Sequence, residues 1–541
     1  MFSAIWLVLG ALIFFILGYR IYGNFVSRRL GVDENRKTPA HEMSDGVDYV
    51  PAKAPVLLGH HFASIAGAAP IIGPVTAAAF GWLPVILWII IGGIFIGAVH
   101  DFSSIIVSVR HQGRSIGEVI EERIGLEGKR LFLIFSFFAL ILVISAFFSI
   151  VAKTFVANPS AGRSSILFIV LAVLFGMVVY RKNAPLGLST VIGVVLLLFC
   201  VYLGTQLPGE LSEKAWLILI ALYVVVAATV PVWILLQPRD YLNSFLLYML
   251  MAGAIIGIFF ANPAIQLEPV TSFSIDKGYL FPILFVTVAC GAISGFHSLV
   301  GSGTTAKQLN SEKDAKLIGY GGMLIESLLA VVAIITAATL AKADYAAMLA
   351  ESGPVAIFSD GVGRFMTHLH IPHDKGETFA ALAVSAFALT TLDTATRLGR
   401  FAFQEFFTSK SAQKQSVLTT NRFIGTAVAA GLGFALAVSG SWETIWPLFG
   451  SANQLLAALA FMAISLWLGV RGIRYGFTLI PMIFMFAVTL SALVFVFLQN
   501  VRDGNYVLGV LSAGLLCVGV LLIALAFKRF GFKRTPGRES V

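Results

Sequence analysis

Three carboxylates lie within otherwise apolar stretches of the sequence, where they could carry a proton or hold a cation. Asp101 lies in GAVHDFSS, Glu326 near the middle of an apolar run, and Asp393 in TTLDTAT. An ionisable group inside a bilayer is costly and is by default a functional candidate. We predict that these carboxylates bind the coupling ion, and that hydroxyls close to the third contribute: Asp101, Glu326, Asp393, Thr390, Thr391 and Thr394.

Each carboxylate also has a purely structural interpretation. Asp101 could pair with Arg110 or another cation near the inner interface, and Asp393 could pair with Arg397, one helical turn further on. Glu326 could make a structural hydrogen bond instead of carrying a proton. The sequence leaves these alternatives open.

Two membrane-length segments are interrupted by glycine, proline and polar residues: GHHFASIAGAAPIIGP at 59–74 and CGAISGFHSLVGSGTT at 290–305. Unwound backbone survives in a membrane only where protein buries it or where it lines a cavity. A pair of interrupted spans, one in each half of a chain, indicates a transporter's binding site. The alternative is that the glycines only allow close helix packing. We predict these substrate-binding residues: His60, His61, Gly67, Pro70, Gly73, Ser294, His297, Ser298, Ser302, Thr304 and, from a later span, Asn453 and Gln454.

No resident metal or cofactor is expected. His60 and His61 are adjacent and point to different helix faces, so a shared metal is not predicted. The three histidines of HLHIPHD at 368–374 lie in a polar loop, where we expect them to be solvated. The three cysteines are far apart in apolar runs and form no CxxC pair, so neither a disulfide framework nor redox chemistry is predicted.

The elements that position these residues are membrane helices. The 541-residue chain is 58% hydrophobic and 12% charged, with a mean hydropathy of +0.89, whereas an ordinary domain has about 25% charged residues. No P-loop, dinucleotide fingerprint or HExxH pair is present, so neither ATP hydrolysis nor enzymatic activity is expected. The net charge of +9 follows from basic loops and does not indicate nucleic-acid binding.

Fifteen spans are predicted, starting near residues 3, 59, 83, 130, 161, 185, 214, 241, 279, 317, 376, 420, 443, 475 and 506. With the N-terminus outside and the C-terminus inside, 29 of the 37 lysines and arginines fall in cytoplasmic loops, Arg239 among them. This asymmetry follows the positive-inside rule. The odd spacing of the two interrupted segments makes them antiparallel, as an inverted repeat requires.

Residues 1–541 are therefore interpreted as one integral membrane transport domain. It carries a cytoplasmic loop at 26–55 and an external loop at 342–375, with an amphipathic helix across 355–368. A short surface helix is predicted within 110–128, and 528–541 form a basic cytoplasmic tail.

Several strings resemble the carbon starvation protein A family: DGVDYVP (45–51), GHHF (59–62), GAISGFHSL (291–299), TLDTATRL (391–398) and WPLFG (446–450) with NQLL (453–456). The resemblance covers nearly the whole chain. It implies an inner-membrane carrier for peptides or, as in some members, for pyruvate with protons during nutrient limitation. This chain has His100 where members of the family often carry glutamine.

The family is grouped with the amino acid–polyamine–organocation superfamily, so the resemblance also implies a core of two inverted five-helix repeats, similar to LeuT. The second, ninth and eleventh spans then correspond to the first, sixth and eighth core helices. By this analogy, hydroxyls of Thr390, Thr391, Thr394 and Thr396, with Asp393, face carbonyls of the first break and hold a proton or Na⁺.

The leading hypothesis is a secondary transporter that imports short peptides or small carboxylates with protons. The alternatives are Na⁺-coupled symport and, less favoured, a passive channel. The partners expected are a small-molecule substrate, H⁺ or Na⁺ and the lipid bilayer, but no nucleic acid; the sequence leaves the oligomeric state open.

Overall fold

The computed structural model describes residues 2–182, 184–275, 278–408, 416–440 and 442–532. Most of these residues are in helices. Twelve helices in this part of the chain are long and apolar enough to cross a bilayer. The protein is therefore a multi-pass, all-α membrane protein. The twelve spans contain α1–α2 (Ala4–Leu17, Gly23–Leu30), α6–α7 (Trp82–Gly92, Ala98–Arg110), α9 (Leu126–Ala157), α10 (Pro159–Gly176), α11 (Leu186–Gln206), α13 (Leu236–Ala261), α17 (Gly322–Ala338), α20 (His373–Phe407), α22 (Arg422–Ser439), α23 (Trp442–Val470), α24 (Gly476–Arg502) and α25 (Tyr506–Phe532).

Single π-helical turns join or end several of these spans. Such turns shift the side-chain register of a helix and occur often near functional sites. They are η1 (Gly18–Tyr22), η3 (Gly93–Gly97), η4 (Met177–Arg181), η5 (Gly301–Thr305) and η6 (Lys316–Gly321).

The first broken segment consists of α4 (Ala54–Ile65) and α5 (Ala69–Ala77), which meet at an angle of 44°. The segment ends in a 3₁₀ turn, η2 (Ala78–Phe80). Pro70 lies in the first turn of α5, where a missing N–H costs no intrahelical bond. A Cβ on Gly67, in the break, would lie 2.4 Å from Thr391 Oγ1 of α20. Glycine is therefore needed here for the close approach of α20.

The second broken segment consists of α14 (Leu280–Thr287), α15 (Gly295–Val300), η5 and α16 (Ala306–Gln308). Its break, residues 288–294, begins against the first broken segment, because a Cβ on Gly73 would lie 2.5 Å from the Thr287 carbonyl oxygen and 3.2 Å from Val288 Cα. A Cβ on Gly295 would lie 2.1 Å from the Asn453 carbonyl oxygen and 2.4 Å from Ala457 N. The start of α15 thus packs directly on the backbone of α23.

A helical segment is present at each of the fifteen predicted spans, but not every segment is long and apolar enough to cross a bilayer. Twelve pass by length and apolarity, and the bent pair of the first broken segment makes a thirteenth. The remaining two correspond to α12 (Glu213–Thr229), which has only 17 residues, and to the second broken segment. The fifteen-span count and the inverted five-helix repeat stay predictions.

Shorter elements occupy the predicted loops. α19 (Gly353–Thr367) corresponds to the helix predicted at 355–368, and α18 (Lys342–Glu351) precedes it. α8 (Ile116–Ile124) lies within 110–128, and α3 (Pro39–Glu42) lies within 26–55. Residues 533–541 of the predicted basic tail lie outside the described residues. The remaining elements are α21 (Val417–Thr420) and the antiparallel strands β1 (Ser274–Ile275) and β2 (Gly278–Tyr279).

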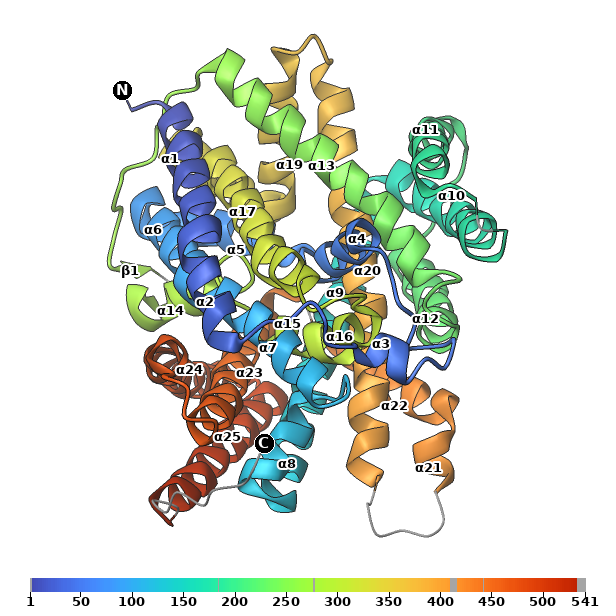
Figure 1. Ribbon diagram of the computed structural model, residues 1–541. Coiled ribbons are helices and arrows are strands. Elements are labelled where there is room, and N and C mark those ends of the chain that lie inside the picture. Colours follow the sequence, from blue (N-terminus) through green and yellow to red (C-terminus); the bar gives the residue numbers. More distant parts are fainter. Residues whose placement is uncertain (1, 183, 276–277, 409–415, 441, 533–541) are drawn as a thin grey trace.

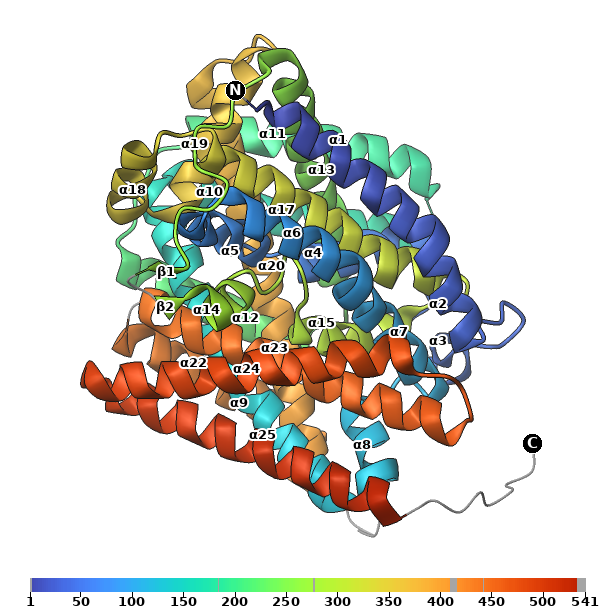
Figure 2. The same ribbon diagram turned by 90° about the vertical axis from the view of Figure 1, so that its left-hand side faces the viewer.

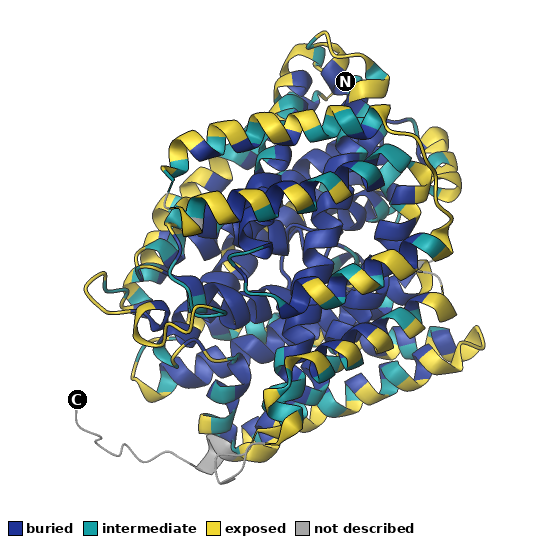
Figure 3. Cartoon of the chain, turned by 90° about the vertical axis from the view of Figure 1, so that its right-hand side faces the viewer, coloured by how far each residue is buried: buried dark blue, intermediate teal, exposed yellow. Residues whose placement is uncertain are grey.

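The broken segments lie in the middle of the helix bundle. Figure 1 shows α10 and α11 at one edge and α24 and α25 at another, with α4, α15 and α20 between them. Figure 2 shows α24 and α25 side by side along one face. In Figure 3 the exposed residues form stripes on the outer helices, and the interior is buried. Large apolar side chains of the outer helices α24 and α25 are exposed, such as Ile480 and Val510 at 72%, which suits contact with lipid.

Candidate functional site

Five side chains from four helices form a buried chain of hydrogen bonds, which we call the Asp393 cluster. His60 Nδ1 of α4 lies 2.7 Å from Asp240 Oδ2, and Arg239 Nη2 donates to Asp240 Oδ1 at 2.8 Å. Arg239 also donates to Asp393 Oδ2, which accepts a second bond of 2.8 Å from the Tyr223 hydroxyl. The cluster therefore ties the first broken segment to α12, α13 and α20.

The Asp393 cluster contains two carboxylates but only one permanently positive group, Arg239. His60, Asp240 and Asp393 are fully buried, and Arg239 is 2% exposed. Buried charges are tolerated only when they are paired. One proton, on His60 or on a carboxylate, makes the cluster neutral. It is therefore a candidate proton-binding site.

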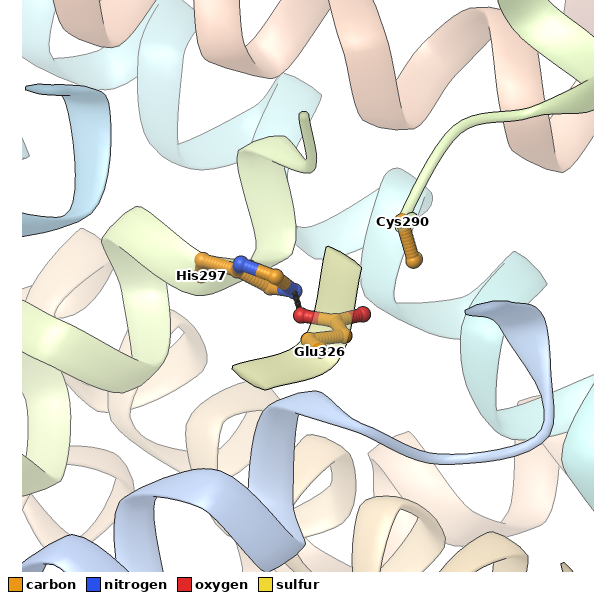
Figure 4. Close-up of side chains that lie close together, drawn as sticks. All are labelled: Cys290, His297 and Glu326. Carbon is orange, nitrogen blue, oxygen red and sulfur yellow. Dashed lines mark ion pairs between the residues drawn. The ribbon is translucent and has the colours of Figure 1, made fainter. Parts of the chain in front are cut away.

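A second buried network, the His297 cluster, surrounds the second break. Asp101 lies between two histidines, with Oδ1 at 2.9 Å from His100 Nδ1 and Oδ2 at 2.8 Å from His297 Nδ1. The other ring nitrogen of His297 lies 3.4 Å from Glu326 Oε2, as Figure 4 shows. Cys290 lies beside this pair (Figure 4). All five side chains are buried.

Hydroxyl groups connect the first break to both of its neighbours. Thr391 Oγ1 of α20 donates to the Ser64 carbonyl at 3.1 Å, and Ser64 Oγ lies 3.1 Å from Thr394 Oγ1. On the other side, His61 Nδ1 lies 2.8 Å from Thr305 Oγ1 of the second broken segment. The end of α4 is thus held between α20 and the second broken segment.

Other predicted binding residues use their polar groups locally. The hydroxyls of Ser298, Ser302, Thr304 and Thr390 all donate to carbonyls three or four residues earlier, at 2.6–3.1 Å. Because these hydroxyls already have acceptors within their own helices, they stabilise the helices in this conformation.

The two amides of α23 hold the second broken segment in place. Asn453 Oδ1 accepts from Phe296 N at 2.7 Å, at the start of α15, and its Nδ2 donates to Ser294 Oγ at 2.9 Å. Gln454 Nε2 donates to the Phe285 carbonyl at 2.5 Å. These contacts satisfy backbone groups that the break leaves without helical partners.

A cavity of about 820 Å³, which we call the vestibule, reaches both broken segments from the end of the bundle near α18 and α19. Ile72 and Thr76 of α5 and Val286 and Thr287 of α14 line its inner part. The charged residues that line it are Lys153 and five acidic residues: Glu351, Asp374, Glu377, Glu443 and Asp503.

At the opposite end, ion pairs fasten the loop 26–55 to the helices. Arg397 Nη1 donates to Asp48 Oδ1 at 2.9 Å. Arg36 of the loop pairs with Glu312 Oε1 at 3.3 Å, and Arg110 Nη2 of α7 donates to Glu312 Oε2 at 2.8 Å. Burial by itself raises the pKa of Asp48, but the positive charges of Arg397, Lys307 and Arg400 outweigh it and hold this pKa below its ordinary value. A smaller cavity of about 520 Å³, lined in part by Gly303 and Lys307, lies at this end.

Replacing Asp48 by asparagine is expected to lower stability by about 1–3 kcal/mol, because the buried Arg397 loses its charged acceptor. The lowered pKa makes this contribution fully present above the unfolded-state pKa and lost as the pH falls below 3.8, through the folded-state value. The difference in unfolding free energy between variant and wild type, obtained from thermal unfolding, should therefore stay constant from about pH 5 to about pH 8. Glu34→Gln, at an exposed pair with Lys313, is the matched control. A difference that changes within that pH range would contradict this account of Asp48.

Sequence reasoning missed three members of the Asp393 cluster: Tyr223, Arg239 and Asp240. Arg239 was assigned to a cytoplasmic loop, but α13 begins at Leu236 and encloses it. The adjacent charges of the string QPRD, directly before an apolar run, were the available signal. One structural alternative is not what the structure shows, because Asp393 pairs with Arg239 instead of Arg397. Asp101 contacts His100 and His297 and not Arg110.

The architecture is that of a transporter-like membrane protein. It combines many helical spans with two broken segments, buried charge clusters and a vestibule. The family model described as "Carbon starvation protein CstA" matches residues 3–352 and 346–492. The chain belongs to the carbon starvation protein CstA family.

Relatives that are named as transporters align over most of the chain. The peptide transporter CstA of Bacillus subtilis is 32% identical, over 98% of this chain and 97% of its own. The peptide transporter CstA of Campylobacter jejuni is 33% identical, over 90% and 79% of the two chains. The pyruvate/proton symporter BtsT of Escherichia coli is 33% identical, over 85% and 76%.

Among solved structures, a manganese transporter of Eremococcus coleocola aligns over 90% of this chain and 99% of its own, at 12% identity and a TM-score of 0.41. This likeness is too distant to support an argument about fold or function.

Proposed function

We propose that this protein is a secondary active transporter of the inner membrane that imports short peptides, small carboxylates such as pyruvate, or both, with protons. The observation that carries the proposal is the charge of the Asp393 cluster, which one bound proton makes neutral. The relatives' names, peptide transporter and pyruvate/proton symporter, agree with this class of substrate and with this coupling ion.

The coupling mechanism follows from the position of Arg239 between two carboxylates. Protonation of Asp393 removes half of the negative charge that holds Arg239, so the contact between α13 and α20 weakens. Because Thr391 and Thr394 of α20 hold the end of α4, the first break is then free to move. A proton thereby biases which end of the protein is open.

The orientation is part of the proposal. With the N-terminus outside, the vestibule faces outward and receives the substrate, and the ion pairs of Asp48 and Glu312 close the cytoplasmic end. Half-helix N-termini at the breaks attract the carboxylate of the substrate. Five acidic residues against one lysine in the vestibule attract a positively charged amino terminus, which supports peptides as the favoured substrate.

The deciding measurement is uptake of labelled pyruvate, dipeptides and tripeptides into proteoliposomes, with and without an inward proton gradient. Saturable accumulation that disappears when the gradient is dissipated is the expected result. No gradient-dependent uptake of any of these compounds would overturn the proposed function. Uptake that equilibrates without accumulating would indicate the passive channel instead.

Na⁺ coupling is the second candidate, favoured by the oxygens around the first break. The Ser64 carbonyl and the hydroxyls of Ser64, Thr391 and Thr394 lie close together and offer the oxygen ligands that Na⁺ prefers. Uptake driven by a Na⁺ gradient at equal pH on both sides would establish this alternative.

A further inference from the structure

We propose that Cys290, His297 and Glu326 bind a single divalent cation of the Zn²⁺ class, a site beyond the proposed transport function. The thiol sulfur, the imidazole nitrogen and a carboxylate oxygen lie within 4.8 Å of one another. His297 and Glu326 are fully buried and Cys290 is 4% exposed. Figure 4 shows the three side chains converging from α15, α17 and the second break.

The potential ligand atoms of two of the three groups lack hydrogen-bond partners in the described part of the chain, while the Cys290 sulfur contacts Ser294 Oγ at 3.4 Å. His297 Nε2 and both Glu326 oxygens have no hydrogen-bond partner among the described residues. A buried carboxylate that receives no hydrogen bond is costly, and a cation between these atoms removes that cost. The 3.4 Å separation of His297 Nε2 and Glu326 Oε2 matches the edge of about 3.4 Å that two ligands with bonds of about 2.1 Å form in a tetrahedral zinc site.

The surroundings orient the ligands in the manner of known metal sites. Asp101 Oδ2 lies 2.8 Å from His297 Nδ1, so a proton on Nδ1 leaves the lone pair of Nε2 directed toward Glu326. Metal-binding histidines commonly have a carboxylate in this position. Asn453 Nδ2 donates to the Cys290 sulfur at 3.8 Å, which stabilises a thiolate.

One sulfur, one nitrogen and one carboxylate oxygen select Zn²⁺ or Co²⁺ over Na⁺, Mg²⁺ or Ca²⁺, which prefer oxygen ligands only. Binding forms one bond to each of the three side chains and releases the thiol proton to solvent. A fourth ligand position stays open. Thr287, three residues before Cys290 in the chain, lines the vestibule, so we expect the ion to enter from that side.

The test is metal binding by the purified, tag-free full-length chain in detergent, after removal of bound metals with a chelator. We expect one Zn²⁺ per chain, and with Co²⁺ a near-ultraviolet thiolate-to-cobalt charge-transfer absorption. Cys290→Ser should abolish this absorption, and Glu326→Gln should weaken Zn²⁺ binding by about tenfold or more. Cys200→Ser and Cys517→Ser are the matched controls and should leave both unchanged. Asp101→Asn, at a positioning residue, should weaken binding but keep the thiolate absorption.

Zn²⁺ binding that is absent in wild type, or equal in wild type, Cys290→Ser and Glu326→Gln, would overturn the proposal. Where Cys290→Ser does not fold, the wild-type spectrum decides, since a Co²⁺ complex without thiolate absorption also overturns it. Both measurements are made without transport, so their failure is distinct from a failure of the proposed function.

Discussion

Replacing Asp393 by asparagine is expected to reduce proton-driven uptake to the level of protein-free liposomes while the protein stays folded. Asparagine keeps the shape of the side chain but removes the charge that opposes Arg239. Removing one partner of a buried ion pair costs about 3–5 kcal/mol when the other charge is left alone. Arg239 keeps its pair with Asp240, so we expect a smaller loss. The measurements are uptake in proteoliposomes and thermal unfolding in detergent.

Two further variants make the result specific. Asp344→Asn, at an exposed position of α18, should leave uptake unchanged. The double variant Asp393→Asn, Arg239→Gln also takes the arginine away from the buried carboxylate of Asp240, so it should be less stable than the single variant and should not recover uptake. Normal gradient-driven uptake by Asp393→Asn would remove Asp393 from the mechanism.

Replacing Gly295 by alanine is expected to lower the thermal stability of the protein strongly, although it adds only one methyl group. The added carbon would lie 2.1 Å from the Asn453 carbonyl oxygen and 2.4 Å from Ala457 N, and both atoms belong to the backbone of α23. Backbone cannot rotate away as a side chain can, so α15 must move. Overpacking costs about 1–3 kcal/mol and occasionally more. We expect the upper end of this range or beyond, measured as a fall in thermal stability in detergent, together with loss of uptake.

Gly431→Ala is the matched control, because no atom lies within 4 Å of its added carbon in α22. An exposed glycine in a helix is about 1 kcal/mol less favourable than alanine, so this variant should be as stable as wild type or more stable. Equal stabilities of the Gly295 and Gly431 variants would show that α15 does not pack against α23 as described.

The adjacent histidines of α4 link the Asp393 cluster to the second broken segment. His60 contacts Asp240 of the Asp393 cluster, while His61 contacts Thr305 of the second broken segment. Successive residues point about 100° apart around a helix, so each faces a different neighbour. A displacement of α4 therefore changes both contacts at once, which is the property a coupled transporter requires.

The sequence by itself determined the class of the protein and the location of both breaks. These features depend only on residues that are close together in the sequence. A long apolar run predicts a span, glycine and proline within it predict a break, and a carboxylate within it marks a candidate site. For the same reason the helices around 355–368 and 110–128 could be predicted. The family strings, two of which lie in the broken segments, agree with the family model match.

Only the tertiary structure decided which charges meet. Arg239 and Asp393 are 154 residues apart, and His60 and Asp240 are 180 apart. Near Asp101 and Asp393 the sequence offered a local arginine, Arg110 and Arg397 respectively, yet these arginines bind Glu312 and Asp48. Likewise, Glu326 reaches His297 and Cys290 only because α17 packs beside the second break. The pairing of buried charges depends on helix packing. Packing brings together side chains that are far apart in the sequence, and no repeating pattern in the sequence indicates which of them will meet.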